Sequence, residues 1–226
     1  FNLGFILGGT AIIHSLKTSR TVVFRDGIFL LFGGILLSVF LWDLTLSKIE
    51  GIVLFTLLVL YLLYLYFKKE TIETEEPTHA MYRWDPILLF VGIGLVIVGS
   101  HFLVESAVSI ARFMGVSDWV IGATIIAAGT SAPEFATSLT AAMKSRYGMS
   151  VGNLIGSDIF NLFGVLGVAG MMRNLSVGHD AHINLIILSF MIAVVLIFMR
   201  TGWVVSRKEG IILVMIGLLR WIYSFS

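Results

Sequence analysis

The chain has 226 residues, of which 58% are hydrophobic and only 13% are charged, and its mean hydropathy is +0.98. Soluble domains carry about 25% charged residues, so this composition excludes an ordinary soluble protein and predicts an integral membrane protein. The absence of cysteine excludes disulfides and thiolate metal sites, and the near balance of 15 Lys and Arg against 14 Asp and Glu gives no reason to expect nucleic acid as a partner.

Eight apolar segments follow one another along the chain, most of them near the roughly 20 residues that a helix needs to cross a bilayer. They predict an all-α polytopic membrane protein. The expected helices cover residues 1–13, 22–42, 49–67, 86–113, 119–143, 149–172, 183–199 and 210–225. Arg25 and Asp26 are expected to mark a helix end at the surface, and Arg220 to reach from the last helix toward the membrane interface.

The charge-rich stretch 68–85 divides the chain into a part at 1–67 and a part at 86–226. This charge pattern is typical of a solvated linker between two helical bundles. If successive helices alternate in direction, eleven Lys and Arg fall on the side of this linker and four on the other. The positive-inside rule then places the linker in the cytoplasm.

An internal repeat occurs at a constant offset of 159 residues. Phe-Asn-Leu at 1–3 returns at 160–162, and Ser-Lys-Ile-Glu-Gly-Ile at 47–52 returns as Ser-Arg-Lys-Glu-Gly-Ile at 206–211. Residues 1–67 therefore pair with 160–226, and a copy of about 85–159 is expected to precede Phe1 in an intact protein of ten helices. Five helices per repeat is an odd number, so the second repeat is expected to be inverted, as in secondary transporters.

Two polar breaks interrupt the apolar segments of the second repeat, at 129–134 and at 152–161. Pro133 removes a backbone donor, so carbonyls at 127–129 are expected to lose their helical partners beside Thr130, Ser131 and Glu134. Ser157 and Asn161 are four apart, so on a helix they share a face. All these ligands are hard oxygens, which suit Ca²⁺ and Na⁺.

A structural role is the alternative for each of these groups. Glu134 could be a buried structural acid, although an intramembrane carboxylate is a functional hypothesis by default. The hydroxyls of Thr130, Ser131 and Ser157 could instead bond to nearby helix carbonyls. Asp158 has two open interpretations, as a group that tunes the site or as a structural partner, and is left outside the predicted ligand set.

Gly-Ala-Thr-Ile-Ile-Ala-Ala-Gly-Thr-Ser-Ala-Pro-Glu at 122–134 and Val-Gly-Asn-Leu-Ile-Gly-Ser-Asp-Ile-Phe-Asn at 151–161 resemble the second α-repeat of the sodium/calcium exchangers, in the calcium:cation antiporter superfamily. The α-repeat motif spans 122–167. The resemblance implies that ions are held by Thr130, Ser131, Glu134, Ser157 and Asn161, by a carbonyl near Ala127, and by Asn2 from the first repeat. It further implies a second glutamate from the first repeat, outside this chain.

The resemblance also implies a function: exchange of Ca²⁺ for Na⁺ by alternating access, electrogenic, in a prokaryotic plasma (inner) membrane, by a monomer. The ions are then substrates, no cofactor is expected, and the protein is not an enzyme. The neutral amide of Asn161, at a position that is acidic in some relatives, argues against K⁺ co-transport. A Ca²⁺/H⁺ exchanger on the same scaffold and a passive cation channel remain as alternatives.

Overall fold

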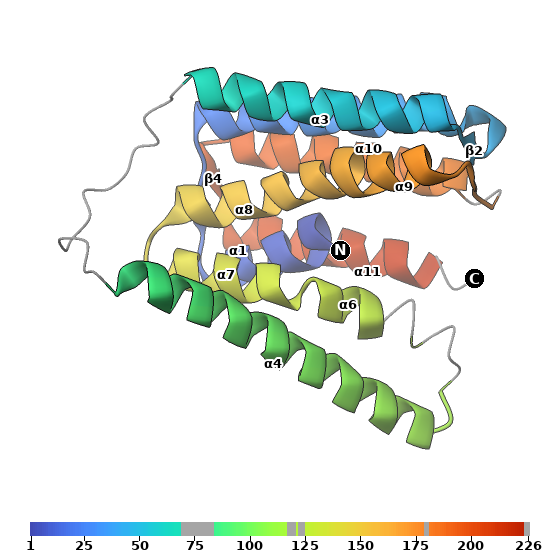
Figure 1. Cartoon of the computed structure of the whole chain (residues 1–226). Coiled ribbons are helices and arrows are strands. Elements are labelled where there is room, and N and C mark those ends of the chain that lie inside the picture. The colour runs from blue at the N-terminus through green and yellow to red at the C-terminus, as the bar shows by residue number, and fades with distance from the viewer. Residues whose placement is uncertain (69–83, 117–120, 122–124, 179–180, 224–226) are drawn as a thin grey trace.

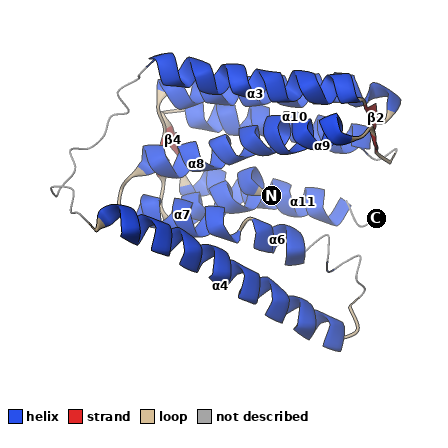
Figure 2. Cartoon of the chain, viewed as in Figure 1, coloured by secondary structure: helices blue, strands red, loops and turns tan. Residues whose placement is uncertain are grey.

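The computed structural model describes residues 1–68, 84–116, 121, 125–178 and 181–223, and these residues are almost entirely helical (Figure 2). Within these described residues, five helices are long and apolar enough to cross a membrane, and a shorter apolar helix, Asn2–Ile13, precedes them. The five are Val22–Asp43, Lys48–Lys68, Asp85–Phe113, Tyr147–Met172 and Ala181–Arg200. The predicted all-α membrane fold is confirmed, and each of the eight predicted segments is mainly helical where the structure describes it, with an interruption at Ser131 in the segment 119–143.

The elements follow one another in two series. The first contains η1 (Asn2–Ile6), α1 (Leu7–Ile13), β1 (Leu16–Lys17), η2 (Val22–Gly27), α2 (Ile28–Phe40), η3 (Leu41–Asp43), β2 (Thr45–Leu46) and α3 (Lys48–Lys68). The second contains α4 (Asp85–Phe113), α6 (Ala127–Thr130), α7 (Ala132–Met143), α8 (Tyr147–Ile159), η5 (Phe160–Val165), α9 (Leu166–Met172), β3 (Leu175–Ser176), α10 (Ala181–Arg200), β4 (Val204–Val205) and α11 (Arg207–Tyr223). The elements η1, η2 and η5 are π-helical, and η3 is a 3₁₀ turn.

The offset of 159 found in the sequence also relates the elements. Adding it to the bounds of α1, β1 and β2 gives the bounds of α9, β3 and β4, and the first residue of α3 maps onto the first residue of α11. Contacts repeat in the same way, because α1 packs on α11 while α3 packs on α9. The two halves are thus related by a pseudo-two-fold operation.

Two short antiparallel sheets give the direction of that operation. β1 pairs with β4 and β2 pairs with β3, so each sheet joins one strand from each half. Figure 1 shows β4 and β2 at opposite ends of the bundle. Exchanging the halves therefore turns the bundle end over end, as an inverted-topology repeat requires.

Glycines line the two seams where the halves pack most closely. A Cβ added to Gly51 of α3 would lie 2.6 Å from the backbone nitrogen of Met171, and one added to Gly210 of α11 would lie 2.7 Å from the carbonyl oxygen of Gly8. Small residues at such positions let membrane helices approach to backbone contact. The seams α3–α9 and α1–α11 therefore depend on these glycines.

A capping box begins the last helix of each half. In α3 the Ser47 N–H donates to Glu50 Oε2 at 2.7 Å and the Glu50 N–H donates to Ser47 Oγ at 3.3 Å. Ser206 and Glu209 make the same bonds at 2.7 and 3.4 Å before α11. This reciprocal pair satisfies backbone donors that a helix start leaves unpaired.

The expectation that Arg25 and Asp26 mark a helix end at the surface is wrong. Both lie inside η2, and Asp26 is only 8% exposed. Asp26 pairs with the guanidinium of Arg25 and accepts a 2.7 Å hydrogen bond from the Tyr61 hydroxyl of α3. The ring of Phe29 stacks on Tyr61 and on Phe163 with centroids 4.5 Å apart in each case. The acid is tolerated in the interior because both neighbouring donors satisfy it.

Candidate ion site

The predicted helix break is present between α6 and α7. Ser131 stands between the two helices with φ −94° and ψ 0°, and Pro133 is the second residue of α7. The Ser131 N–H donates to the carbonyl of Ala128 at 3.2 Å, three residues back, where a continuous α-helix would use Ala127. This geometry is compatible with the predicted use of the Ala127 carbonyl as a ligand.

Gly129 lies where α6 meets α4. A Cβ at this position would be 1.9 Å from Cγ2 of Val104, so a larger residue would require the Val104 side chain or α4 to shift. Figure 1 shows α4 as an outer helix that runs along α6 and α7, and α4 contacts both of these helices. The glycine of the motif thus fixes the position of the broken helix against its neighbour.

Glu134 lies in the first turn of α7 and is half-buried. Its Oε2 atom is buried and has no hydrogen-bond partner among the described residues. The backbone oxygen of Glu134 accepts a 3.4 Å bond from Asn153 Nδ2, which also donates to Ser138 Oγ at 3.0 Å. Asn153, which the sequence did not single out, therefore joins α7 to α8 beside the carboxylate.

Asn2 and Ser157 meet across the two halves, as predicted. Asn2 is 5% exposed, and its Nδ2 donates to Ser157 Oγ and to Asp158 Oδ1, both at 2.9 Å. The Oδ1 atom of Asn2 is buried and, within the described part of the chain, unpartnered. Ser157 also donates to the Leu154 carbonyl at 3.1 Å, which is the back-bonding weighed as its structural role. The Ser157 hydroxyl oxygen still accepts the hydrogen bond from Asn2 Nδ2.

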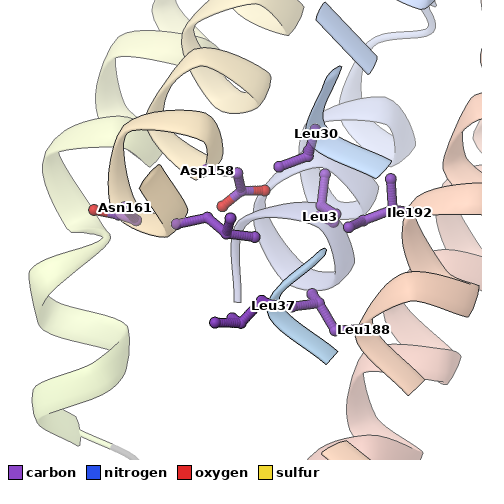
Figure 3. Close-up of a pocket in the computed structure, with 8 residues that line it drawn as sticks. Leu3, Leu30, Leu37, Asp158, Asn161, Leu188 and Ile192 are labelled. Atoms are coloured by element: carbon purple, nitrogen blue, oxygen red, sulfur yellow. The ribbon is translucent and has the colours of Figure 1, made fainter. Parts of the chain in front are cut away.

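Asn161 does not join this group. Its side chain is exposed, and in Figure 3 its amide points away from Asp158. Of the second break expected at 152–161, only the C-terminal end is irregular, because α8 runs continuously through Tyr147–Ile159. The irregularity comes later, as the π-helical η5 (Phe160–Val165), whose wider i→i+5 turns alter the facing of residues four apart. Thr130 is exposed and Ser131 half-buried at the α6–α7 break.

A cavity of about 250 Å³ adjoins Asp158 and is otherwise nearly apolar. Figure 3 shows the Asp158 carboxylate directed among leucine side chains from α2 and α10. The lining residues are Leu3, Leu30, Leu37, Asp158, Asn161, Leu162, Leu188 and Ile192. Asp158 is thus an interior acid that the predicted ligand set omitted.

An inverted helical repeat around a broken helix, with carboxylate and amide oxygens in its interior, defines the class of secondary ion transporters. The family model described as sodium/calcium exchanger protein matches residues 84–222. The chain therefore belongs to the sodium/calcium exchanger family, as its motifs indicated. This is a family of membrane antiporters for Ca²⁺ and other cations.

Similarity over nearly the whole of this chain supports the same assignment. The chain is 28% identical to the sodium/calcium exchanger MaX1 of Methanosarcina acetivorans, over 95% of this chain and 74% of that protein. It is 30% identical to the inner membrane protein YrbG of Escherichia coli, over 92% and 67% of the two chains. A solved structure of the sodium-calcium exchanger NCX_Mj, soaked without Na⁺ and Ca²⁺, superposes with a TM-score of 0.82 at 28% identity, covering all of this chain and 73% of that one.

Proposed function

We propose that the protein is an electrogenic antiporter that extrudes Ca²⁺ in exchange for Na⁺ entering down its gradient. The observation that carries this proposal is the buried Glu134 Oε2, a carboxylate oxygen beside a helix break for which the described residues provide no hydrogen-bond partner. A carboxylate at membrane depth is costly unless it has a counter-charge, and a transported cation supplies one.

The ligands around Glu134 explain the choice of cation. They are the Ala127 carbonyl and the side-chain oxygens of Thr130, Ser131, Ser157 and Asn2. Asn161, whose amide points away from Asp158 in this structure, joins them once its side chain turns inward. Oxygen-only sites suit Ca²⁺ and Na⁺, which are hard cations. The two ions compete for overlapping positions, and α4 moves relative to the rest of the bundle to change access. A site whose fixed charge requires an occupant disfavours the crossing of an empty carrier.

The distribution of Lys and Arg indicates how the protein is oriented in the membrane. The excess of Lys and Arg on the side of the 68–85 linker supports a cytoplasmic linker in the plasma membrane of a prokaryote. The protein then works as a monomer in the lipid bilayer, without a cofactor, on ions that are its substrates.

Ion gradients across proteoliposomes test the proposal. Vesicles loaded with Na⁺ and diluted into Na⁺-free buffer with ⁴⁵Ca²⁺ should accumulate Ca²⁺, and dissipating the Na⁺ gradient should abolish uptake. A pH gradient that drives uptake without Na⁺ would instead identify a Ca²⁺/H⁺ exchanger. Ca²⁺ flux at channel rates with no counter-ion would identify a passive channel.

Electrogenicity has a separate test in the same vesicles. A K⁺ diffusion potential imposed with valinomycin should change the initial rate of Na⁺-driven Ca²⁺ uptake, because an electrogenic cycle moves net charge. Rates that do not respond to the potential would show an electroneutral cycle.

A further inference from the structure

We propose that Asp158 supplies a second fixed negative charge to the ion site and thereby favours Ca²⁺ over Na⁺. This inference rests on the proposed exchange function. It assigns to residue 158 a charge that the neutral amide at position 161 does not provide.

The hydrogen bonds of Asn2 are the first support. A side-chain amide nitrogen has two hydrogens, and Asn2 Nδ2 donates at 2.9 Å to each of Ser157 Oγ and Asp158 Oδ1. The donors of this amide are therefore fully used. Asn2 thus binds both Ser157 and Asp158, and the Asp158 carboxylate lies at the contact between the two halves.

The unpartnered oxygens are the second support. Asn2 is 5% exposed, and its Oδ1 atom has no partner in the described structure, as is the case for Glu134 Oε2. A buried acceptor without a donor is costly, because it has lost its hydrogen bonds to water. Because both atoms are acceptors only, a cation satisfies them where a protein donor is lacking.

The surroundings of Asp158 are the third support. Its carboxylate faces a cavity lined mainly by leucines (Figure 3), so on that side polar side chains add little to the hydrogen bond from Asn2. Glu134 lies within electrostatic range of Asp158, and so does Arg220 of α11. Two carboxylates repel one another in an unliganded site, and a divalent cation between them relieves that repulsion more than a monovalent one.

A role for Asp158 as a structural partner of Arg220 is the competing explanation, and Asp158→Asn separates the two. Asparagine has nearly the same shape, and its carbonyl oxygen can still accept the bond from Asn2, so mainly the charge is lost. The interaction of a charge with Ca²⁺ is twice that with Na⁺. The fold-loss for Ca²⁺ should be about the square of that for Na⁺, on the order of a hundredfold against tenfold.

The experiment measures equilibrium ⁴⁵Ca²⁺ binding and its displacement by Na⁺ on the purified protein, beside thermal unfolding. Asp43→Asn is the matched control, because Asp43 is exposed and only caps the Thr45 N–H. Asp158→Glu keeps the charge and should keep the preference for Ca²⁺. If Asp158→Asn binds Ca²⁺ as the parent does, or loses affinity for both ions equally together with thermal stability, Asp158 is not a charge of the site. A parent protein that neither binds nor exchanges Ca²⁺ would instead overturn the proposed function.

Discussion

The α3–α9 seam provides a quantitative prediction for Gly51→Ala. The added Cβ would lie 2.6 Å from the nitrogen of Met171, 2.7 Å from the carbonyl carbon of Gly170 and 2.9 Å from the oxygen of Gly167. All three are backbone atoms, so the helices must separate. Overpacking of this kind costs about 1–3 kcal/mol. Alanine also returns up to about 1 kcal/mol through its higher helix propensity.

The control is Gly9→Ala in α1, where an added Cβ meets no described atom within 4 Å. That variant receives the propensity gain alone, so the two should differ by about 1–3 kcal/mol. At about 2–4 °C per kcal/mol for a chain of this size, the gap in midpoint is about 2–12 °C. The assay is thermal unfolding of the detergent-purified proteins. Equal midpoints for the two variants would refute the close seam.

Three further tests, which use four substitutions, examine the ion site and the contacts that support the helices. Glu134→Gln should abolish Na⁺-dependent Ca²⁺ uptake in proteoliposomes while leaving the unfolding midpoint near that of the parent, and normal uptake would overturn the assignment of this carboxylate. Tyr61→Phe removes the donor to Asp26 and should destabilise by about 1–3 kcal/mol, whereas an unchanged midpoint would show that this bond contributes nothing. Ser47→Ala and Ser206→Ala should each cost about 1 kcal/mol, and their effects should add, because they cap different helices; a strongly non-additive double variant would contradict independent caps.

The helices and their repeat could be predicted because the sequence shows both directly. The helices appear as apolar segments of about the length of a bilayer crossing, and the repeat appears as matching residues at a constant offset. Hydropathy placed the helix at 49–67 within one residue of Lys48–Lys68, since the bilayer sets the length of the apolar segment. The Ser-x-x-Glu sequences that recur at the offset of 159 form matching capping boxes before α3 and α11. The break before Pro133 followed from the missing backbone donor alone.

The direction of individual side chains could not be predicted in the same way. A spacing of four places Ser157 and Asn161 on one face only if the helix stays α, and η5 (Phe160–Val165) begins between them. The amide of Asn161 points outward as a result, while Asp158 is bound by Asn2. That bond joins residues 156 positions apart, and only tertiary packing creates it.

The two strand pairs constrain the order in which the chain can be completed during synthesis. β1 at Leu16–Lys17 finds its partner only at Val204–Val205, and β2 at Thr45–Leu46 only at Leu175–Ser176. The first half therefore enters the membrane with both strand edges unpaired, and the contacts that close them are among the most distant in the chain. Such distant pairings form late in folding. Neither sheet can form until the ribosome has made the second strand of its pair, at 175–176 for β2 and at 204–205 for β1.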